Sequence, residues 1–504
     1  MPDVDDQSPI PFGVRDDGWV LDDLKTDAIL ASPAWPLSKS IMQERAGVNE
    51  GDFGVDESRY DPNDLRAVGW AVLFAPGVDP KIKEALQPLL DHRKNLVGEG
   101  PFRIFDGDYQ PRETAKQWLA RQKVSMRTVV PKAGVPYYLL IVASPADISF
   151  EFQYSLDIFW AVGRIWFETA EENPHPEPDK FRQYAWSVVC YEKAKTVPTS
   201  RQLAFFTAQN QGDKATRLLM KEVALPLVNG TEIEGPIGQD PKQKFKVHSI
   251  LGNTANKDAL NAILRGQSPD GPPALLFTGS HGKAVSDPSN VADLAELRGA
   301  LICGDWVRGV PATPDQVYAG RDLPADAKVH GMIHFMFACY GAGWPQYDNY
   351  GAMKDGLAQN YVRVGGNAPQ ISPRPMVSRL PQNLLSHVAG GALAVIGHID
   401  RAWAWSFESE ADIAQPGDFS MILNQLMAGN RIGQATDKFN FNWAALSTDI
   451  GDNLSQMQIN GKVLPEAEMK KLANQWIARD DARNYVVFGD PAVRLRTEDM
   501  PVLT

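Results

Sequence analysis

The sequence predicts an α/β protein with a mostly parallel sheet that helices cover on both faces. Three observations predict it. Short apolar runs of strand length recur along the chain, segments with helical spacing separate them, and Gly or Pro closes several of the runs. Fully apolar strands that alternate with helices are typical of parallel sheets buried on both faces. In such sheets, reactive groups gather at the carboxyl ends of the strands.

The chain divides into three predicted regions. Residues 1–65 are rich in Asp, Pro and Gly, which indicates an extended arm with little fold of its own. Residues 66–200 form a first α/β unit, and residues 201–504 form a second, larger one. The expected strands are Trp70–Ala75, Tyr137–Ala143, Leu203–Thr207, Phe245–Leu251, Ala274–Thr278, Met332–Ala338, Ala392–Gly397 and Tyr485–Phe488. The expected helices are Pro80–Leu90, Phe181–Ala194, Lys214–Val228, Asp258–Arg265, Leu384–Gly391 and, with a Gly break, Phe419–Phe439.

Composition excludes several classes of protein. The net charge of −12 argues against general binding to nucleic acid or to anionic membranes. The three cysteines, Cys190, Cys303 and Cys339, are too few for a disulfide framework and have the wrong spacing for a Cys-only zinc site. The acidic first residues lack the pattern of a secretory signal, and no apolar run approaches the ~20 residues that cross a bilayer. We therefore expect a cytoplasmic protein.

A histidine and a cysteine each stand just past a predicted strand. His281 follows the run in ALLFTGSHG, and Cys339 follows the run in MIHFMFACYGAG. If both runs are parallel strands, the two side chains emerge at the same edge of the sheet, where neighbouring strands lie about 4.8 Å apart. Cysteine needs a nearby base or cation to react near neutral pH. The pair therefore predicts a nucleophile, Cys339, with His281 as its general base and acid.

Glycines flank both residues. Gly282 follows the histidine, and Gly341 and Gly343 follow the cysteine. Glycine lets the backbone turn sharply and lets a substrate approach closely. The exposed N–H groups of Gly282 and Cys339 could then form an oxyanion hole, in which one donor is typically worth about 2.7–4 kcal/mol in the transition state. Cys190, inside a helical pattern, and Cys303, at a strand end, are expected to be structural.

At these residues the chain resembles the caspase-like cysteine peptidase superfamily of gingipains, legumain, clostripain and caspases, and gingipain-type enzymes most. The motifs are ALLFTGSHG, FMFACYGAG, ALAVIGHIDRAW and the closing YVVFGDPAVRL, within roughly residues 200–496. The resemblance implies a caspase-like sheet of about six strands, a Cys–His dyad, and cleavage of polypeptide after a chosen residue type. The preceding α/β unit is also gingipain-like.

The chain departs from the family at the place that sets specificity. Members often carry a polar or charged residue two places before the nucleophile, where this chain has Phe337. Two acidic residues could still supply a pocket for a basic substrate residue. Asp213 follows the first strand of the second unit, and Asp400 follows a later strand. Asp213 could instead cap a helix, and Asp400 could pair with Arg401. Trp306, Trp344 and Trp403 could line the cleft or simply pack in the core.

Other chemistry has less support. His330 and His334 form H-x-x-x-H, but Gly331 stands where the helical zinc motif needs Glu, so we expect no metal and no cofactor. His398 also follows a strand and ranks second as a base. Ser280 lacks the elbow pattern of a serine nucleophile.

The sequence thus predicts a cysteine endopeptidase acting on polypeptide through a thioester. Two alternatives stay open. One is an inactive scaffold of the same fold, with the first α/β unit binding a protein partner. The other is a cysteine hydrolase or acyltransferase acting on a non-peptide amide or ester.

Overall fold

The computed structural model describes residues 10–22 and 54–503, apart from 233, 241, 288, 349–369, 405–406, 408–415 and 461–465. Its centre is a ten-stranded sheet in which every strand pair but one is parallel. The order across the sheet is β3 (Phe102–Asp106), β2 (Trp70–Phe74), β4 (Tyr138–Val142), β5 (Ala161–Ile165), β16 (Tyr485–Gly489), β15 (Ala394–His398), β12 (Ile333–Phe337), β8 (Pro273–Gly279), β6 (Ser200–Thr207) and β7 (Lys246–Leu251). The predicted α/β class with a mostly parallel sheet is confirmed.

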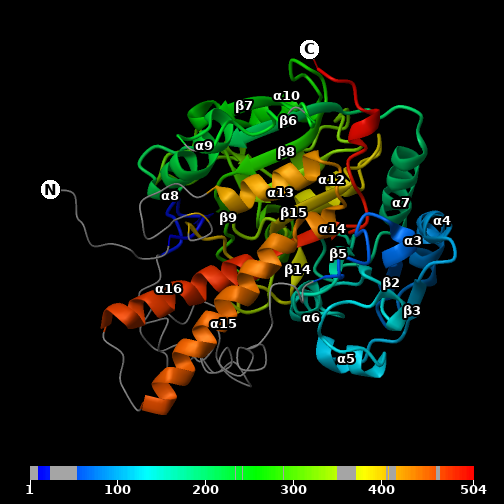
Figure 1. Cartoon of the computed structure of the whole chain (residues 1–504). Coiled ribbons are helices and arrows are strands. Elements are labelled where there is room, and N and C mark those ends of the chain that lie inside the picture. The colour runs from blue at the N-terminus through cyan, green and yellow to red at the C-terminus, as the bar shows by residue number, and fades with distance from the viewer. Residues whose placement is uncertain are drawn as a thin grey trace.

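Helices flank this sheet (Figure 1). Those of the first part are α3 (Leu65–Val68), α4 (Pro80–Val97), α5 (Ala115–Arg121), α6 (Phe150–Asp157) and α7 (Pro178–Lys193). Those of the second are α8 (Lys214–Leu219), α9 (Leu225–Asn229), α10 (Lys257–Leu264), α11 (Val291–Leu297), α12 (Arg379–Leu385), α13 (Gly417–Met427), α14 (Ile432–Ala435), α15 (Asp437–Asn460) and α16 (Glu466–Arg483). Helices α15 and α16 lie side by side and project away from the sheet.

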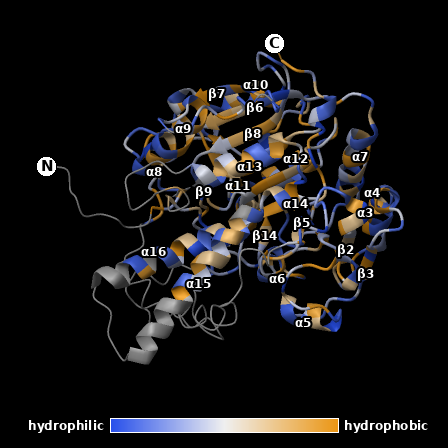
Figure 2. Cartoon of the chain, in the orientation of Figure 1, coloured by the Kyte–Doolittle hydropathy of each residue, from blue (hydrophilic) through white to orange (hydrophobic). Residues whose placement is uncertain are grey.

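The strands are apolar because both of their faces are covered. All residues of β2, β4, β8, β12 and β15 are buried, and Figure 2 shows β8 in the hydrophobic colour. Helix α13 packs on this part of the sheet through Phe419, whose ring lies 6.1 Å from that of Phe277 in β8 and 5.6 Å from that of Phe335 in β12. This packing fixes the two strands that lead to the candidate site.

The two predicted α/β units share one continuous sheet. Strand β5 of the first unit pairs with β16 at the end of the chain. After β16, Asp490 accepts hydrogen bonds from Trp70 Nε1 at 2.9 Å and from Arg93 Nε at 2.6 Å, both in the first unit. The closing Gly-Asp-Pro motif therefore joins the two halves. The boundaries at residues 65 and 200 stay predictions.

Every predicted strand is present, and within the ten-stranded sheet β3 and β5 were missed. β3 is an edge strand with exposed residues, and β5 carries a buried Arg164, so neither has a plain apolar pattern. The predicted helix over Leu384–Gly391 is mostly wrong, because α12 begins at Arg379 and ends at Leu385. Gly390 then takes a φ of +113°, a conformation outside the helix. The predicted Gly break after α13 is confirmed at Gly429.

A small second sheet brings the N-terminal arm to the large one. Its order is β1 (Gly13–Val14), β9 (Gly282–Lys283), β10 (Leu301–Ile302) and β11 (Val317–Tyr318). Strand β1 pairs in parallel with β9, which follows His281 directly. Part of the predicted arm thus lies on the body of the protein. Residues 1–9 and 23–53 lie outside the described residues.

Candidate active site

His281 and Cys339 follow two neighbouring parallel strands. In the pairing of β8 with β12, Gly279 lies opposite Phe337, and each candidate comes two residues after its strand's last residue. Both therefore stand at the carboxyl ends of adjacent strands, as the sequence predicts. The exposed fraction of each is 0%.

The backbones of Gly282 and Cys339 touch. A Cβ atom at Gly282 would lie only 1.9 Å from the carbonyl oxygen of Cys339, so no residue with a side chain fits there without moving the chain. This close approach lets both peptide N–H groups donate to one acceptor. The acceptor is the carbonyl oxygen of Phe12, at 2.9 Å from the nitrogen of Gly282 and 3.1 Å from that of Cys339.

Phe12 belongs to a segment of the arm, Ile10–Val14, that crosses the site in an extended form. On one side, Phe12 N donates to the carbonyl oxygen of Ala402 at 2.9 Å, and Ala404 N donates to Ile10 at 3.0 Å. This is an antiparallel pairing with the loop after β15. On the other side, β1 pairs with β9. The backbone of the segment is thus bound along its length, as an added strand would be.

The thiol of Cys339 lies beneath this segment. Its Sγ accepts a hydrogen bond from Ala402 N at 3.2 Å and lies 3.6 Å from the carbonyl oxygen of the same residue. A Cβ atom at Gly13 would lie 3.3 Å from Sγ, so glycine lets the arm pass close over the sulfur. Burial raises the pKa of the Cys339 thiol above its ordinary range, an effect that outweighs the hydrogen bond from Ala402.

His281 is held by a carboxylate. Its Nε2 lies 2.9 Å from Oδ2 of Asp213, which is 3% exposed. The same oxygen accepts hydrogen bonds from Thr216 N at 2.8 Å and Thr216 Oγ1 at 2.7 Å at the start of α8. Burial alone would raise the pKa of Asp213, but the charge and hydrogen bond of His281 and the bonds from Thr216 lower it well below its ordinary range. A carboxylate only accepts, so Nε2 donates.

The other ring nitrogen of His281, Nδ1, points away from Asp213. Within the described part of the chain, Nδ1 is buried and has no hydrogen-bond partner. The imidazole ring lies between two aromatic side chains, with its centroid 5.6 Å from that of Phe12 and 5.9 Å from that of Trp306. With Nε2 donating to Asp213, the neutral ring keeps a lone pair on Nδ1.

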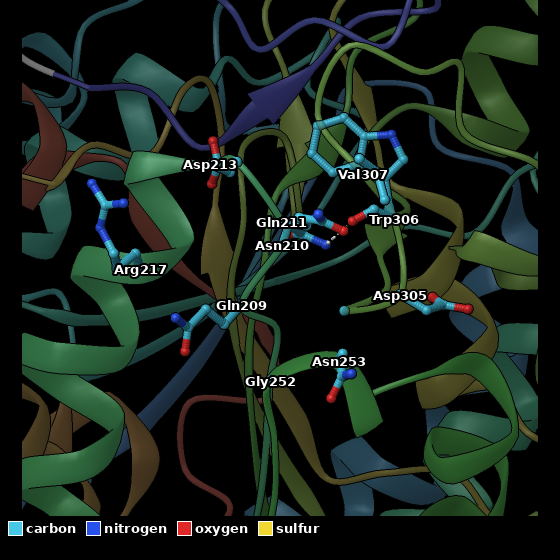
Figure 3. Close-up of a pocket in the computed structure, with 12 residues that line it drawn as sticks. Gln209, Asn210, Gln211, Asp213, Arg217, Gly252, Asn253, Asp305, Trp306 and Val307 are labelled. Carbon is cyan, nitrogen blue, oxygen red and sulfur yellow. Dashed lines mark hydrogen bonds between the residues drawn. The ribbon is translucent and has the colours of Figure 1, made fainter.

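A cavity of about 580 Å³ opens beside Asp213 (Figure 3). Figure 3 shows Arg217 and Asp305 on opposite sides of it. Asn210 crosses to the facing loop, with Nδ2 2.7 Å from the carbonyl oxygen of Cys303. Asp213 and Trp306 both contact His281 and both line the cavity, so the cavity adjoins the candidate site. Its lining residues are Gln209, Asn210, Gln211, Gly212, Asp213, Arg217, Gly252, Asn253, Gly304, Asp305, Trp306 and Val307.

The residues expected to shape a substrate pocket have different surroundings. The carboxylate of Asp213 is engaged by His281 and by the start of α8, so capping and histidine binding both occur there. Asp400 is buried with a φ of +90°, and its carbonyl oxygen accepts from Tyr340 N at 2.7 Å. Trp403 lies against the arm, bridged to Pro11. Trp344 is buried in β13 (Gly343–Trp344), where the Arg298 guanidinium lies 5.6 Å from its ring.

Three further candidates, His334, His398 and Cys303, lie in the packed core. His334 Nε2 bonds Thr278 Oγ1 at 2.8 Å between β12 and β8, and burial lowers its pKa to about 3. The ring of His398 packs edge-on against Tyr485 at 4.0 Å. Burial raises the pKa of Cys303 to about 12, and the pKa of Cys190 is raised for the same reason. Among the described residues, no cluster of metal-ligating side chains is present.

Sequence reasoning missed the parts of the site that come from loops and the arm. These are Phe12, Gly13, Ala402 and Phe407, together with the hydrogen bond from His281 to Asp213. One signal was present. Residues 10–14 read IPFGV, an apolar island within an acidic arm, and such an island predicts burial against something.

Comparisons with known proteins give little. No protein-family model matches the chain, and no curated protein matches it. A solved structure named "Structure of Protease" resembles it with a TM-score of 0.47 and 12% identity, over 86% of this chain and 79% of that one. A similarity of this size indicates nothing about function. None of the helices in the described ranges is both long enough and apolar enough to span a membrane.

Proposed function

We propose that this chain is a cysteine peptidase of the caspase-like type, in which Cys339 attacks a peptide carbonyl and His281 moves the proton. One observation carries the proposal. The carbonyl oxygen of Phe12 accepts hydrogen bonds from the N–H groups of both Gly282 and Cys339, while the next residue, Gly13, lies against Sγ. A peptide bond thus sits where an oxyanion hole and a nucleophile would have to hold it.

The proposed acylation step uses the groups that meet at this site. Nδ1 of His281 takes the thiol proton as Sγ bonds to the carbonyl carbon, and the carbonyl oxygen becomes an oxyanion. The N–H groups of Gly282 and Cys339 bind that oxyanion. The C–N bond then breaks, the leaving amine takes the proton from His281, and a thioester remains on Cys339. Asp213 stabilises the imidazolium that forms between these two transfers.

Hydrolysis completes the cycle. His281 takes a proton from water as the water oxygen attacks the thioester carbonyl, and the same two N–H groups bind the second oxyanion. The C–S bond breaks, the thiolate regains a proton, and a carboxylic acid leaves. No metal and no cofactor enters any step. The cytoplasmic setting stays a prediction.

A second function is favoured by the burial of the site. Both Cys339 and His281 are fully buried, and the thiol pKa is raised. A protein in which the arm never leaves would be a scaffold, with the chemistry closed off. The first α/β unit would then bind a protein partner, as in the scaffold alternative from the sequence.

Activity towards a peptide library tests the proposal. Full-length protein is incubated with mixed peptides long enough to pair along an extended cleft, and the products are identified by mass spectrometry. We expect cleavage that Cys339→Ala and His281→Ala abolish and that Cys190→Ala, a matched thiol control on α7, leaves unchanged.

The same library is run with the full-length Phe12→Asp variant, which places a charge in a buried apolar site and so favours release of the arm. If neither protein cleaves any peptide while both are folded, the peptidase proposal is wrong and the scaffold is favoured. Turnover of small esters or amides without any peptide cleavage would instead favour the non-peptide hydrolase or acyltransferase.

A further inference from the structure

The arm segment Ile10–Val14 binds the site in the manner of a substrate. Its backbone pairs with Ala402 and Ala404 before the carbonyl of Phe12, and with β9 after it. The oxygen of that carbonyl accepts hydrogen bonds from the N–H groups of Gly282 and Cys339, and Gly13 lies beside the sulfur. Of all the peptide bonds in the segment, the one between Phe12 and Gly13 therefore has its carbonyl oxygen in the proposed oxyanion hole and its next residue beside the sulfur.

The side chain of Phe12 fills a pocket made of rings. Its exposed fraction is 0%, and its ring centroid lies 4.8 Å from that of Phe337, edge-on, and 6.0 Å from that of Phe407. The third ring is that of His281, at 5.6 Å. Phe337 is the residue two places before the nucleophile. Aromatic side chains gain both from burial and from edge-on contacts of this kind.

A basic side chain would be poorly held in this pocket. The rings of His281, Phe337 and Phe407 lie around that of Phe12, and the carboxylate of Asp213 is already bound by His281 and Thr216. A Lys or Arg side chain in the same place would lose its hydration among aromatic rings, which is costly for a charge.

We propose that the cleft selects peptides with a large aromatic residue immediately before the cleaved bond, and that Ile10–Val14 is a built-in occupant that competes with them. The proposal rests on the peptidase function and adds its substrate class. The Phe12 side chain defines the specificity pocket, and Phe337 and Phe407 are its specificity-determining residues. A substrate must displace the arm before it binds.

Five peptides test the selectivity. They share the sequence around residues 10–14 and carry Phe, Tyr, Ala, Arg or Asp in place of Phe12. Using full-length Phe12→Asp protein, we expect kcat/KM for the Phe peptide to exceed that for the Ala and Arg peptides by about 100-fold or more. Equal or faster cleavage after Arg would overturn the substrate class and leave the peptidase function standing.

Binding without catalysis separates the two proposals. In a Cys339→Ala, Phe12→Asp double variant, calorimetry measures the affinity of the Phe and Arg peptides. Tight binding of the Phe peptide alone, with no cleavage by any active form, would retain the pocket and reject the peptidase. Equal binding of both peptides would reject the pocket.

Competition by the arm has its own readout. We expect Phe12→Asp to lower KM for the Phe peptide about tenfold or more relative to wild type, because one buried aromatic ring no longer competes. The matched control is Val388→Asp, which makes a similar apolar-to-charged change at a side chain that is 76% exposed. If both variants keep the wild-type KM, the arm is no competitor.

Discussion

Oδ2 of Asp213 lies 2.9 Å from Nε2 of His281, although 68 residues separate the two in the chain. Asp213 follows β6 and His281 follows β8, and these strands are parallel neighbours. The contact adds a carboxylate to the predicted Cys–His pair, on the side of the imidazole ring that carries Nε2. In the mechanism that we propose, Asp213 is a positioning residue that acts through His281.

Replacing Asp213 by Asn should lower kcat more than it changes KM. Asn still caps α8, so the fold is retained, but it cannot stabilise the imidazolium. We expect kcat for peptide cleavage to fall by about 10²–10⁴-fold. Steady-state kinetics measure this, with Asp64→Asn as the control, since Asp64 also caps a helix, α3, away from the site. A change in KM with an unchanged kcat would reject the positioning role.

Replacing Gly282 by Ala should slow the step that forms the oxyanion. The new Cβ would lie 1.9 Å from the carbonyl oxygen of Cys339, so the backbone must move and the two N–H groups no longer converge. We expect kcat to fall by about 100-fold or more. Gly235→Ala is the control, because nothing lies within 4 Å of the added Cβ there. Wild-type kcat in a folded Gly282→Ala protein would contradict this part of the mechanism.

Release of the arm should change the pH dependence of the alkylation rate of Cys339. Burial raises the pKa of Cys339, so the folded wild type holds the thiol protonated near neutral pH. In Phe12→Asp, solvent reaches Sγ and the thiol pKa should fall. The alkylation rate of Cys339 then rises at pH 7 by about tenfold for each unit of that fall.

Alkylation by iodoacetamide between pH 6 and pH 10 (roughly the range over which exposed thiols ionise) measures the effect. Peptide mapping distinguishes Cys339 from Cys190 and Cys303. Val388→Asp should follow the wild-type profile. Superimposable profiles for wild type and Phe12→Asp would mean that the arm does not control access to the sulfur.

Loss of Asp490 should destabilise the whole chain. Its carboxylate pairs with Arg93, whose side chain is fully buried, and it also accepts from Trp70. Asp490→Ala leaves part of a buried cation without its partner, which typically costs about 3–5 kcal/mol in the free energy of unfolding. Urea unfolding measures the change. Asp179→Ala, which removes an exposed pair with Arg182, should cost under about 1 kcal/mol.

The sequence alone determined the strands that carry the chemistry. The runs before His281 and Cys339 are mostly apolar, and every residue of β8 and β12 is buried, as expected for strands that are covered on both faces. Parallel strands share an edge, so the two residues had to emerge there together. Gly282 was also readable, because a glycine after the histidine marks a close approach of backbones.

Only the tertiary structure decided what surrounds that pair. The sequence predicted that Asp213 could cap a helix. Its hydrogen bond with His281 depends on β6 lying beside β8. The pocket of Phe12, Phe337 and Phe407 joins three segments far apart in the chain, and no periodicity relates them. Local patterns record which residues are buried in a strand or helix. Local patterns do not indicate which distant loop or arm buries those residues, because that depends on packing between elements.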